Sequence, residues 1–323
     1  MKSAHDKIVR LADKLRLTDK TRGLLIKMRK DVLEKVRLNL KAIKNTSQNP
    51  WKITLKQEIT TGSLDRWTAV EKSSDIDVVV AFNFKPIDGG KKCPSSRDLM
   101  KIIELQIPDG YHSMRKKRSV EVTKKIRSDG KDKTIRMDIV PVIVEVGKNV
   151  KQTTWWRGVS KVRPQRGWVQ LNPNHQKDMM KKLSRRKDQK DDPSALIICL
   201  KRWRDVHEKK GAPCELPSYV LEVLVWEDYK KFPEAIDDLT DRFNRILKKF
   251  NRINTKGVSF SKMMGDSHRP KGSKVATGKP LLHDPSNTSV NLVEHIDRQD
   301  LSWWGERATK ASSNDISFGK IFQ

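Results

Sequence analysis

A glycine–serine pair followed by two aspartates constrains this chain more than any other feature. The pair is Gly62-Ser63, and the aspartates are Asp75 and Asp77, which lead into a β-branched segment ending at Val80. A Gly-Ser turn can open a helix whose free N–H groups face an anion. Residues i and i+2 of a strand project from one face, so the two carboxylates would repel each other without a cation. Mg²⁺ is the usual cation where carboxylate oxygens cluster near phosphates.

A third carboxylate stands in a later apolar segment, residues 136–144. Charged and apolar residues alternate at the start of this segment, and the rest of it is wholly apolar, which predicts a second buried strand. Its only acid is Asp138, and an unpaired buried acid is costly, so we expect Asp138 to meet Asp75 and Asp77 across a sheet. The alternative is a pair between Asp138 and Arg136 or a lysine. The turn and the three acids together outline a metal-dependent nucleotidyl-transfer site, with the acids as catalytic and metal-binding residues.

The length and the cysteines limit the class of protein. A chain of 323 residues can hold one large or two modest domains. No apolar run approaches the roughly 20 residues that span a bilayer, and the first residues show no apolar signal region. The three cysteines are widely separated and match no metal spacing, which indicates a reducing compartment. We therefore expect a cytoplasmic protein without a membrane partner.

The charge is the second informative feature. The chain has 68 Lys and Arg against 40 Asp and Glu, a formal net charge of +28. Such an excess favours a polyanionic partner, although a solvated lysine-rich surface is the alternative. The candidate RNA-binding residues are Arg115, Lys116, Lys117, Arg118, Lys181, Lys182, Arg185, Arg186 and Lys187. If structured RNA activates the protein, these residues should form one face away from the three acids.

The periodicity of apolar residues predicts an α+β first half and a helical second half. A long helix is expected over residues 19–45, with a stripe at Leu25, Met28, Val32, Val36, Leu40 and Ile43. Strands are expected at 53–61, 76–84, 119–127 and 133–146, helix or helix flanks at 98–107 and 113–118, and a loop from Trp155 to Trp168. Helices are then expected at 174–186, 193–209, 217–226 and 232–254, followed by a loop at 255–280.

These motifs resemble those of the DNA polymerase β-like nucleotidyltransferases, and within them the bacterial CD-NTases. The latter are relatives of animal cyclic GMP–AMP synthase and the 2′-5′ oligoadenylate synthases. The matching segments are Gly62–Val70, Ser74–Asp77, Arg136–Pro141, Ala195–Arg204, Leu216–Leu224, Leu282–Asn287 and Asn291–Val293. The first three define the superfamily, and the later ones indicate the CD-NTase branch. The resemblance spans roughly residues 20–300.

The resemblance implies a two-lobed α+β fold. A catalytic lobe over residues 1–170 would hold a mixed sheet with helices and a long N-terminal brace helix. A helical lobe over residues 171–323 would close a nucleotide cleft between the two. Asp75 and Asp77 would bridge two Mg²⁺ ions, with Mn²⁺ as an alternative, and Asp138 would ligate the ion that activates the attacking hydroxyl.

The resemblance also implies the nucleotide-binding residues. Gly62 and Ser63 would approach the triphosphate, as would Lys201 or Arg204 from the helix at 193–209. Ser218 would cap the next helix and touch a phosphate, and Tyr219 would stack on a base. Arg204 stands where the family has a lysine. Trp67 departs from the small residue common at its position, so it changes the shape of the nearby pocket.

Three classes of function compete. The first is a synthase that joins nucleoside triphosphates such as ATP and GTP into a cyclic di- or trinucleotide second messenger, as in bacterial anti-phage (CBASS) defence. It would act as a monomer and signal to a downstream effector. The second is a template-independent transferase acting on RNA ends, or a linear oligoadenylate synthase. The third is a non-catalytic binding module, which the presence of all three acids disfavours.

Overall fold

A computed structural model of the chain describes most of its secondary structure. The described residues are 4–42, 51–71, 75–86, 94–116, 118–128, 130–146, 153–158, 168–171, 178–179, 183, 192–232, 239–255, 280–285 and 287–312. They divide into two compact units: residues 17–174 form the sheet unit, and residues 1–16 together with 175–323 form the helical unit. No helix in the described ranges is both long and apolar enough to cross a membrane.

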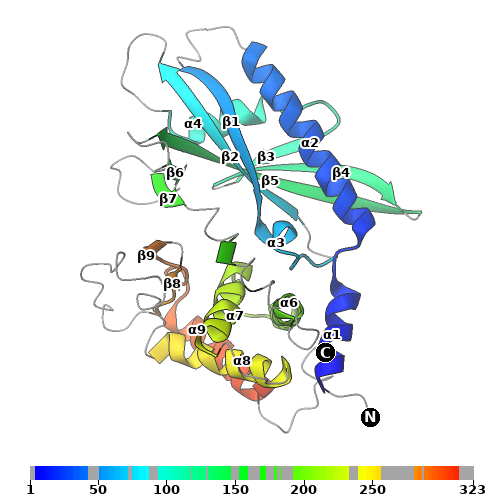
Figure 1. Ribbon diagram of the computed structural model, residues 1–323, viewed down its shortest axis with the longest axis vertical. Helices are drawn as coiled ribbons and strands as arrows, with labels where there is room; N and C mark the ends of the chain where they lie inside the picture. Colours follow the sequence, from blue (N-terminus) through cyan, green and yellow to red (C-terminus); the bar gives the residue numbers. More distant parts are fainter. Residues whose placement is uncertain are drawn as a thin grey trace. The chain divides into compact units, whose positions relative to one another are not determined.

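The sheet unit is built on one mixed sheet (Figure 1). Its strands are β1 (Trp51–Thr61), β2 (Asp75–Pro86), β3 (His112–Arg115), β4 (Val120–Ser128), β5 (Lys131–Val146), β6 (Thr153–Gly158) and β7 (Trp168–Leu171). The main order is β1-β2-β5-β4-β3, and β6 joins β5 to β7. Only β2 and β5 pair in parallel among these strands, while the other described pairs are antiparallel. A parallel pair brings the same ends of two strands together, and this pair carries all three acids.

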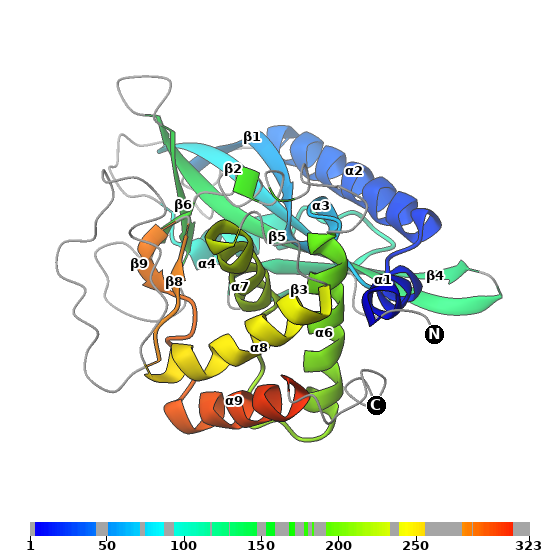
Figure 2. The same ribbon diagram turned by 60° about the horizontal axis from the view of Figure 1, so that its bottom comes forward.

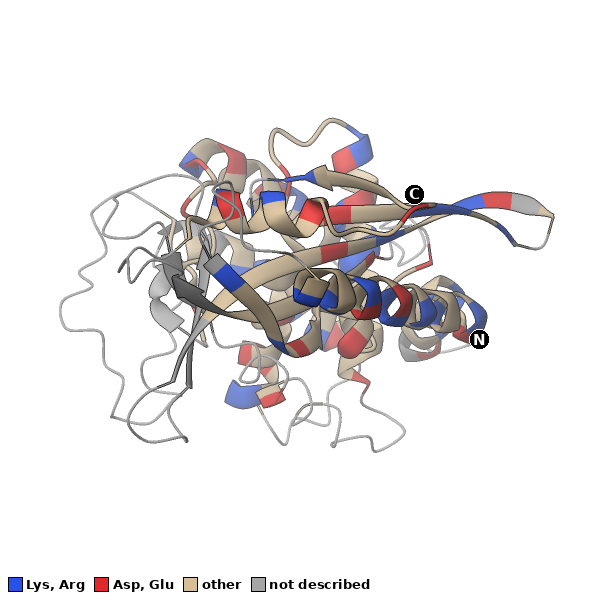
Figure 3. Cartoon of the chain, turned by 90° about the horizontal axis from the view of Figure 1, so that it is seen from above, with Lys and Arg blue, Asp and Glu red and all other residues tan. Residues whose placement is uncertain are grey.

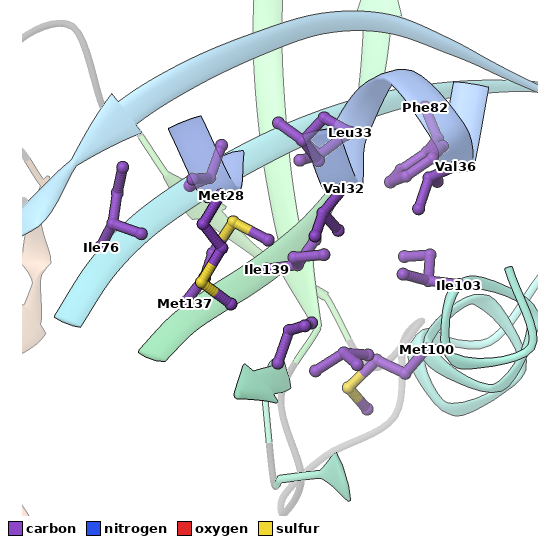
Figure 4. Packing of buried hydrophobic residues seen from close by; sticks show 14 of the residues in the cluster. Met28, Val32, Leu33, Val36, Ile76, Phe82, Met100, Ile103, Met137 and Ile139 are labelled. Atoms are coloured by element: carbon purple, nitrogen blue, oxygen red, sulfur yellow. The ribbon is translucent and has the colours of Figure 1, made fainter. Parts of the chain in front are cut away.

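Helices α2 (Asp19–Ala42) and α4 (Ser96–Glu104) cover one face of the sheet. The expected stripe on α2 is confirmed from Leu25 to Leu40, and its side chains pack on every second residue of β2, β5 and β4. Figure 4 shows this layer, with Met28, Val32, Leu33 and Val36 from α2, Ile76 and Phe82 from β2, Met137 and Ile139 from β5, and Met100 and Ile103 from α4. Strand residues alternate between faces, so burying these side chains turns the acids to the opposite face.

Helix α4 begins at a capping box that its sequence encodes. Ser95 Oγ accepts a hydrogen bond from Asp98 N at 3.1 Å, and the Asp98 carboxylate accepts one from Ser95 N at 3.2 Å. These bonds satisfy two backbone donors that a helix start leaves without partners, a contribution of about 1 kcal/mol.

The helical unit contains α1 (Ala4–Leu15), α6 (Pro193–Lys209), α7 (Ser218–Lys231), α8 (Leu239–Thr255), α9 (Arg298–Ser312) and the short pair β8 (His283–Asp284) and β9 (Asn287–Asn291) (Figure 2). Helix α6 begins at Asp192, whose carboxylate accepts hydrogen bonds from Ser194 N and Ala195 N. The same carboxylate pairs with Arg16 at 2.7 Å, next to the end of α1. Helix α1 therefore packs with α6, although the expected lobes assigned residues 1–170 to the sheet.

Several elements differ from the expectations. The segment 113–118, expected as helix or helix flanks, is strand β3 as far as Arg115. This strand lies at the sheet edge, and its exposed side chains, Met114 among them, do not show the alternation of a buried strand. The expected loop from Trp155 to Trp168 contributes to β6 and β7. Helix α7 continues five residues beyond its expected end at 226, whereas α6 has the expected bounds. Most of the expected helix at 174–186 and loop at 255–280 lies outside the described residues, as do Ser74 and Ile43.

Candidate active site

The three aspartates form one cluster on the face of the sheet opposite α2. Asp77 on β2 is in register with Asp138 on β5, and Asp75 is in register with Arg136. One carboxylate oxygen from each of Asp75, Asp77 and Asp138 lies within 4.8 Å of the others, and all three residues are partly exposed. Three negative charges at this separation repel one another, and oxygen ligands in such a cluster suit Mg²⁺ or Mn²⁺. These residues fit a divalent metal site.

Asp138 has two donors beside it that the sequence motifs did not assign to the cluster. Lys116 Nζ lies 3.2 Å from Asp138 Oδ2 and 2.6 Å from Glu121 Oε2, and Ser119 Oγ lies 3.4 Å from Asp138 Oδ1. Burial lowers the pKa of Lys116, but hydrogen bonds and charges from Glu121 and Asp138 outweigh it, and the pKa is raised. Asp138 therefore pairs with a lysine, as the alternative interpretation expected, and also lies in the cluster with Asp75 and Asp77. Glu121 was detectable in principle, since it is opposite Asp138 in the β4–β5 pairing.

Lys116 also corrects the expectation that the first basic cluster lies away from the acids. The chain leaves the edge strand β3 at Arg115 and enters β4 at Val120, which is in register with Ile139 in the middle of β5, so Lys116 lies beside Asp138. Arg115 is engaged elsewhere, with its Nε 2.6 Å from Glu104 Oε2. Arg118 is exposed. The remaining candidates of the two clusters, Lys117, Lys181, Lys182, Arg185, Arg186 and Lys187, lie outside the described residues.

The Gly62-Ser63 turn lies directly against Asp77. Thr61, the last residue of β1, is in register with Asp77, and the short helix α3 (Gly62–Asp65) follows at once. Gly62 has φ +72°, in the left-handed region that favours glycine. A Cβ at this position would lie 1.9 Å from Asp77 Oδ2, so the carboxylate fills the space that any other residue would need. The glycine of the motif is therefore explained by its contact with the acid cluster.

Trp67 adopts a backbone conformation that is uncommon for a large residue, with φ +61°. Its side chain is 59% exposed, and the Arg22 guanidinium lies 3.3 Å from the ring centroid. Arg22 also donates from Nη2 to Leu64 O at 2.6 Å, which ties α2 to the turn. A glycine would adopt this left-handed conformation without strain, whereas Trp67 adopts it at a cost in backbone energy.

In the helical unit, Lys201 and Glu222 form a buried ion pair. Lys201 Nζ lies 3.0 Å from Glu222 Oε1, and their side chains are 3% and 0% exposed. The family resemblance implied that Lys201 or Arg204 contacts a triphosphate from this helix. In the structure, a buried acid one helix away gives this charge a partner.

Arg204, Ser218 and Tyr219 have other partners in the same unit. Arg204 Nη1 donates to Ser218 Oγ at 2.6 Å and to Leu216 O at 3.1 Å. The N-cap of α7 is Pro217 rather than Ser218, which corrects the expected capping role. Tyr219 Oη donates to Asp284 Oδ1 at 3.2 Å, so this tyrosine connects α7 to β8. The segment 216–219 is therefore fixed by an arginine from α6 and an acid from β8.

The sequence was compared with protein-family models and with curated proteins, and neither comparison found a match.

The fold, in contrast, is similar to several solved structures. CdnC of E. coli MS115-1, in complex with HORMA-deltaN, matches with a TM-score of 0.69 and 17% identity over 95% of this chain and 89% of that chain. The CD-NTase CdnG of Bradyrhizobium diazoefficiens, in complex with GTP, matches with a TM-score of 0.63 and 10% identity over 96% of this chain and 89% of that chain. The Cid1 poly(U) polymerase matches with a TM-score of 0.60 and 15% identity over 99% of this chain and 98% of that chain. The chain therefore has the nucleotidyltransferase fold of these CD-NTase and Cid1 structures.

Proposed function

We propose that the protein is a metal-dependent nucleotidyltransferase that joins nucleoside triphosphates into a cyclic di- or trinucleotide. The observation that carries this proposal is the acid cluster itself. Asp75, Asp77 and Asp138 converge from two parallel strands beside a turn whose glycine contacts one of them. The similar folds of CdnC and CdnG support the proposal, since a structure of CdnC contains ATP and the CdnG structure contains GTP.

Residues at and beside the acid cluster would have separate roles in nucleotidyl transfer. The three carboxylates would hold the divalent ions, and bound ions would supply the positive charge that lowers the pKa of an attacking ribose hydroxyl and stabilises the leaving pyrophosphate. Gly62 lacks a Cβ that would otherwise clash with the Asp77 carboxylate. Ser63, the next residue, would bind the triphosphate. Lys116 neutralises part of the negative charge on Asp138 and Glu121.

The helical unit would supply further nucleotide contacts. Arg204 and Ser218, already hydrogen-bonded to each other, would bind phosphate oxygens, for which a guanidinium is well suited. The Tyr219 ring would stack on a base while its hydroxyl stays with Asp284, and such a stack contributes about 1–3 kcal/mol. Lys201 would act through Glu222 to position this part of α6.

The test is incubation with the four nucleoside triphosphates and Mg²⁺, followed by phosphatase treatment and mass spectrometry. Cyclic products resist phosphatase, whereas linear products do not. Asp75→Asn and Asp77→Asn should each lower product formation by several orders of magnitude without loss of folding, because they remove charge from a crowded site. Asp31→Asn, an exposed position on α2, is the matched control. Wild-type rates in both cluster variants would place the chemistry elsewhere.

A second candidate is a template-independent transferase that adds nucleotides to an RNA end. The similar fold of the Cid1 poly(U) polymerase and the net charge of +28 favour it. The same assay with a labelled RNA separates the two, since a transferase gives a ladder of lengthened RNA and a cyclic-nucleotide synthase leaves the label unchanged.

A further inference from the structure

The face of the sheet that carries the acid cluster continues beyond the cluster onto a two-stranded ribbon. Strand β2 pairs with β5 only from Arg136 onward, and β3 pairs with β4 only as far as Thr123. The ends of β4 and β5 near their connecting turn therefore project past the other strands, as Figure 1 shows for β4. Between these positions and the turn, β4 and β5 pair with each other and have no other described strand beside them.

Register assigns the ribbon's side chains to its two faces. Asp138 pairs with Glu121, and the next pairs on the same face are Arg136 with Thr123, Lys125 with Thr134, and Arg127 with Asp132. The opposite face carries the alternate residues, including Val122 and Met137 of the core. Arg136, Lys125 and Arg127 thus form a row that begins one pair from Asp138, and we call these three residues the hairpin stripe.

The side chains of the hairpin stripe are available to a ligand. All three are exposed, and within the described part of the chain they form no ion pair or hydrogen bond. Their neighbour Lys124, on the other face, instead lies over the Tyr111 ring at 4.6 Å. Figure 3 shows the ribbon with several Lys and Arg positions along it. Between the Glu121–Asp138 pair and the turn, Asp132 is the one acid among the described residues on the stripe's face.

We propose that the hairpin stripe binds the sugar–phosphate backbone of single-stranded RNA next to the acid cluster. This inference rests on the proposed function, since a cluster that joins nucleotides gives a nucleotide chain a reason to lie on the same face. Lys125 and Arg127 are separated by two residues of a strand, about 6.8 Å, so each meets a different point along an extended polyanion. A narrow row on a ribbon suits a flexible single strand, which can follow it.

The test measures binding of a fluorescein-labelled, unstructured oligouridine by anisotropy in EDTA, without nucleotides or metal. The variant is Lys125→Gln with Arg127→Gln, which spares Arg136 beside Asp75. The matched control is Lys27→Gln with Lys30→Gln, two exposed lysines on α2, the helix that covers the opposite face. Thermal melting should show all three proteins equally folded, because every changed side chain is exposed.

The salt dependence gives the expected size of the effect. Each phosphate contact on a single strand adds about 0.7 to the slope of log K against log salt, so two contacts add about 1.4. Between about 50 and 200 mM salt, the wild type and the control should lose about sevenfold more affinity than the stripe variant. Equal slopes in all three proteins would overturn the inference, as would equal binding of polyglutamate or a clear preference for duplex RNA.

The outcome is independent of catalysis. If no product forms from nucleoside triphosphates but the stripe variant shows the reduced slope, the proposed function fails and the RNA site stands. If products form and the slopes are equal, the function stands and the RNA site fails.

Discussion

Replacing Gly62 by alanine should disable the acid cluster by steric contact with Asp77. The new Cβ would lie 1.9 Å from Asp77 Oδ2, 2.8 Å from Cγ and 2.9 Å from Cβ. Since real Cβ contacts stay above 3.0 Å, Oδ2 must retreat by about 1.1 Å. Rotation of the side chain cannot relieve the contact with Asp77 Cβ, so the backbone must also shift. A misplacement of about 1 Å at a reacting centre can cost about a hundredfold in rate.

The structure supplies a matched control for this substitution. Gly110 has φ +83° and no atom within 4 Å of its ideal Cβ position, so Gly110→Ala shares the backbone strain without the contact. Both variants should lose about 1–2 kcal/mol of unfolding free energy in urea from the left-handed backbone. Only Gly62→Ala should lose about a hundredfold in pyrophosphate release and weaken Mn²⁺ binding measured by EPR. Equal activity and equal Mn²⁺ affinity in the two variants would refute the steric argument.

Three further predictions concern the helical unit. Tyr219→Phe removes the hydrogen bond to Asp284 and should lower the unfolding free energy by about 1 kcal/mol, measured in urea; an unchanged midpoint would deny the bond's contribution. Asp228→Asn breaks a buried pair with Arg242 and should cost about 3–5 kcal/mol. Burial raises the pKa of Asp228, but hydrogen bonds and charges from neighbouring cations hold it below the usual value, so this stability should be lost only as pH falls below about 4, as acid melting would show. Burial lowers the pKa of His207, so its NMR titration midpoint should fall below that of an exposed histidine.

The parts of the site that follow from strand alternation could be predicted from the sequence. Asp75, Asp77 and Asp138 each occupy a strand position whose neighbours must face the core, and that requirement fixes their common face. The contacts of Lys116 and Ser119 with Asp138 could not be predicted, because a loop of the edge strand brings them there. Lys201 shows the converse difficulty. The family resemblance implied a phosphate contact, whereas its partner Glu222 belongs to another helix, so the sequence alone does not reveal the buried ion pair.

Helices α1 and α9 were not predicted, for a different reason. Each buries only a narrow row of side chains, such as Ile8 and Ala12 in α1, within an otherwise polar sequence. Their positions depend on contacts with helices far away in the chain. The Cys199 thiol, for example, donates to Ile8 O at 3.5 Å across 191 positions.

The packing of α1 against α6 has a consequence for how the protein is made. Helix α1 leaves the ribosome before the sheet unit, but its partners, including Asp192, emerge only after the whole sheet unit has been synthesised. The sheet unit, residues 17–174, is continuous and can begin to fold while the rest is translated. The helical unit can pack completely only after α6 has been made, because α1 lies before the sheet unit in the chain and α6 after it. A chain truncated before Asp192 would therefore leave Ile8 and Ala12 without the surface that buries them, and expose them to chaperones and proteases.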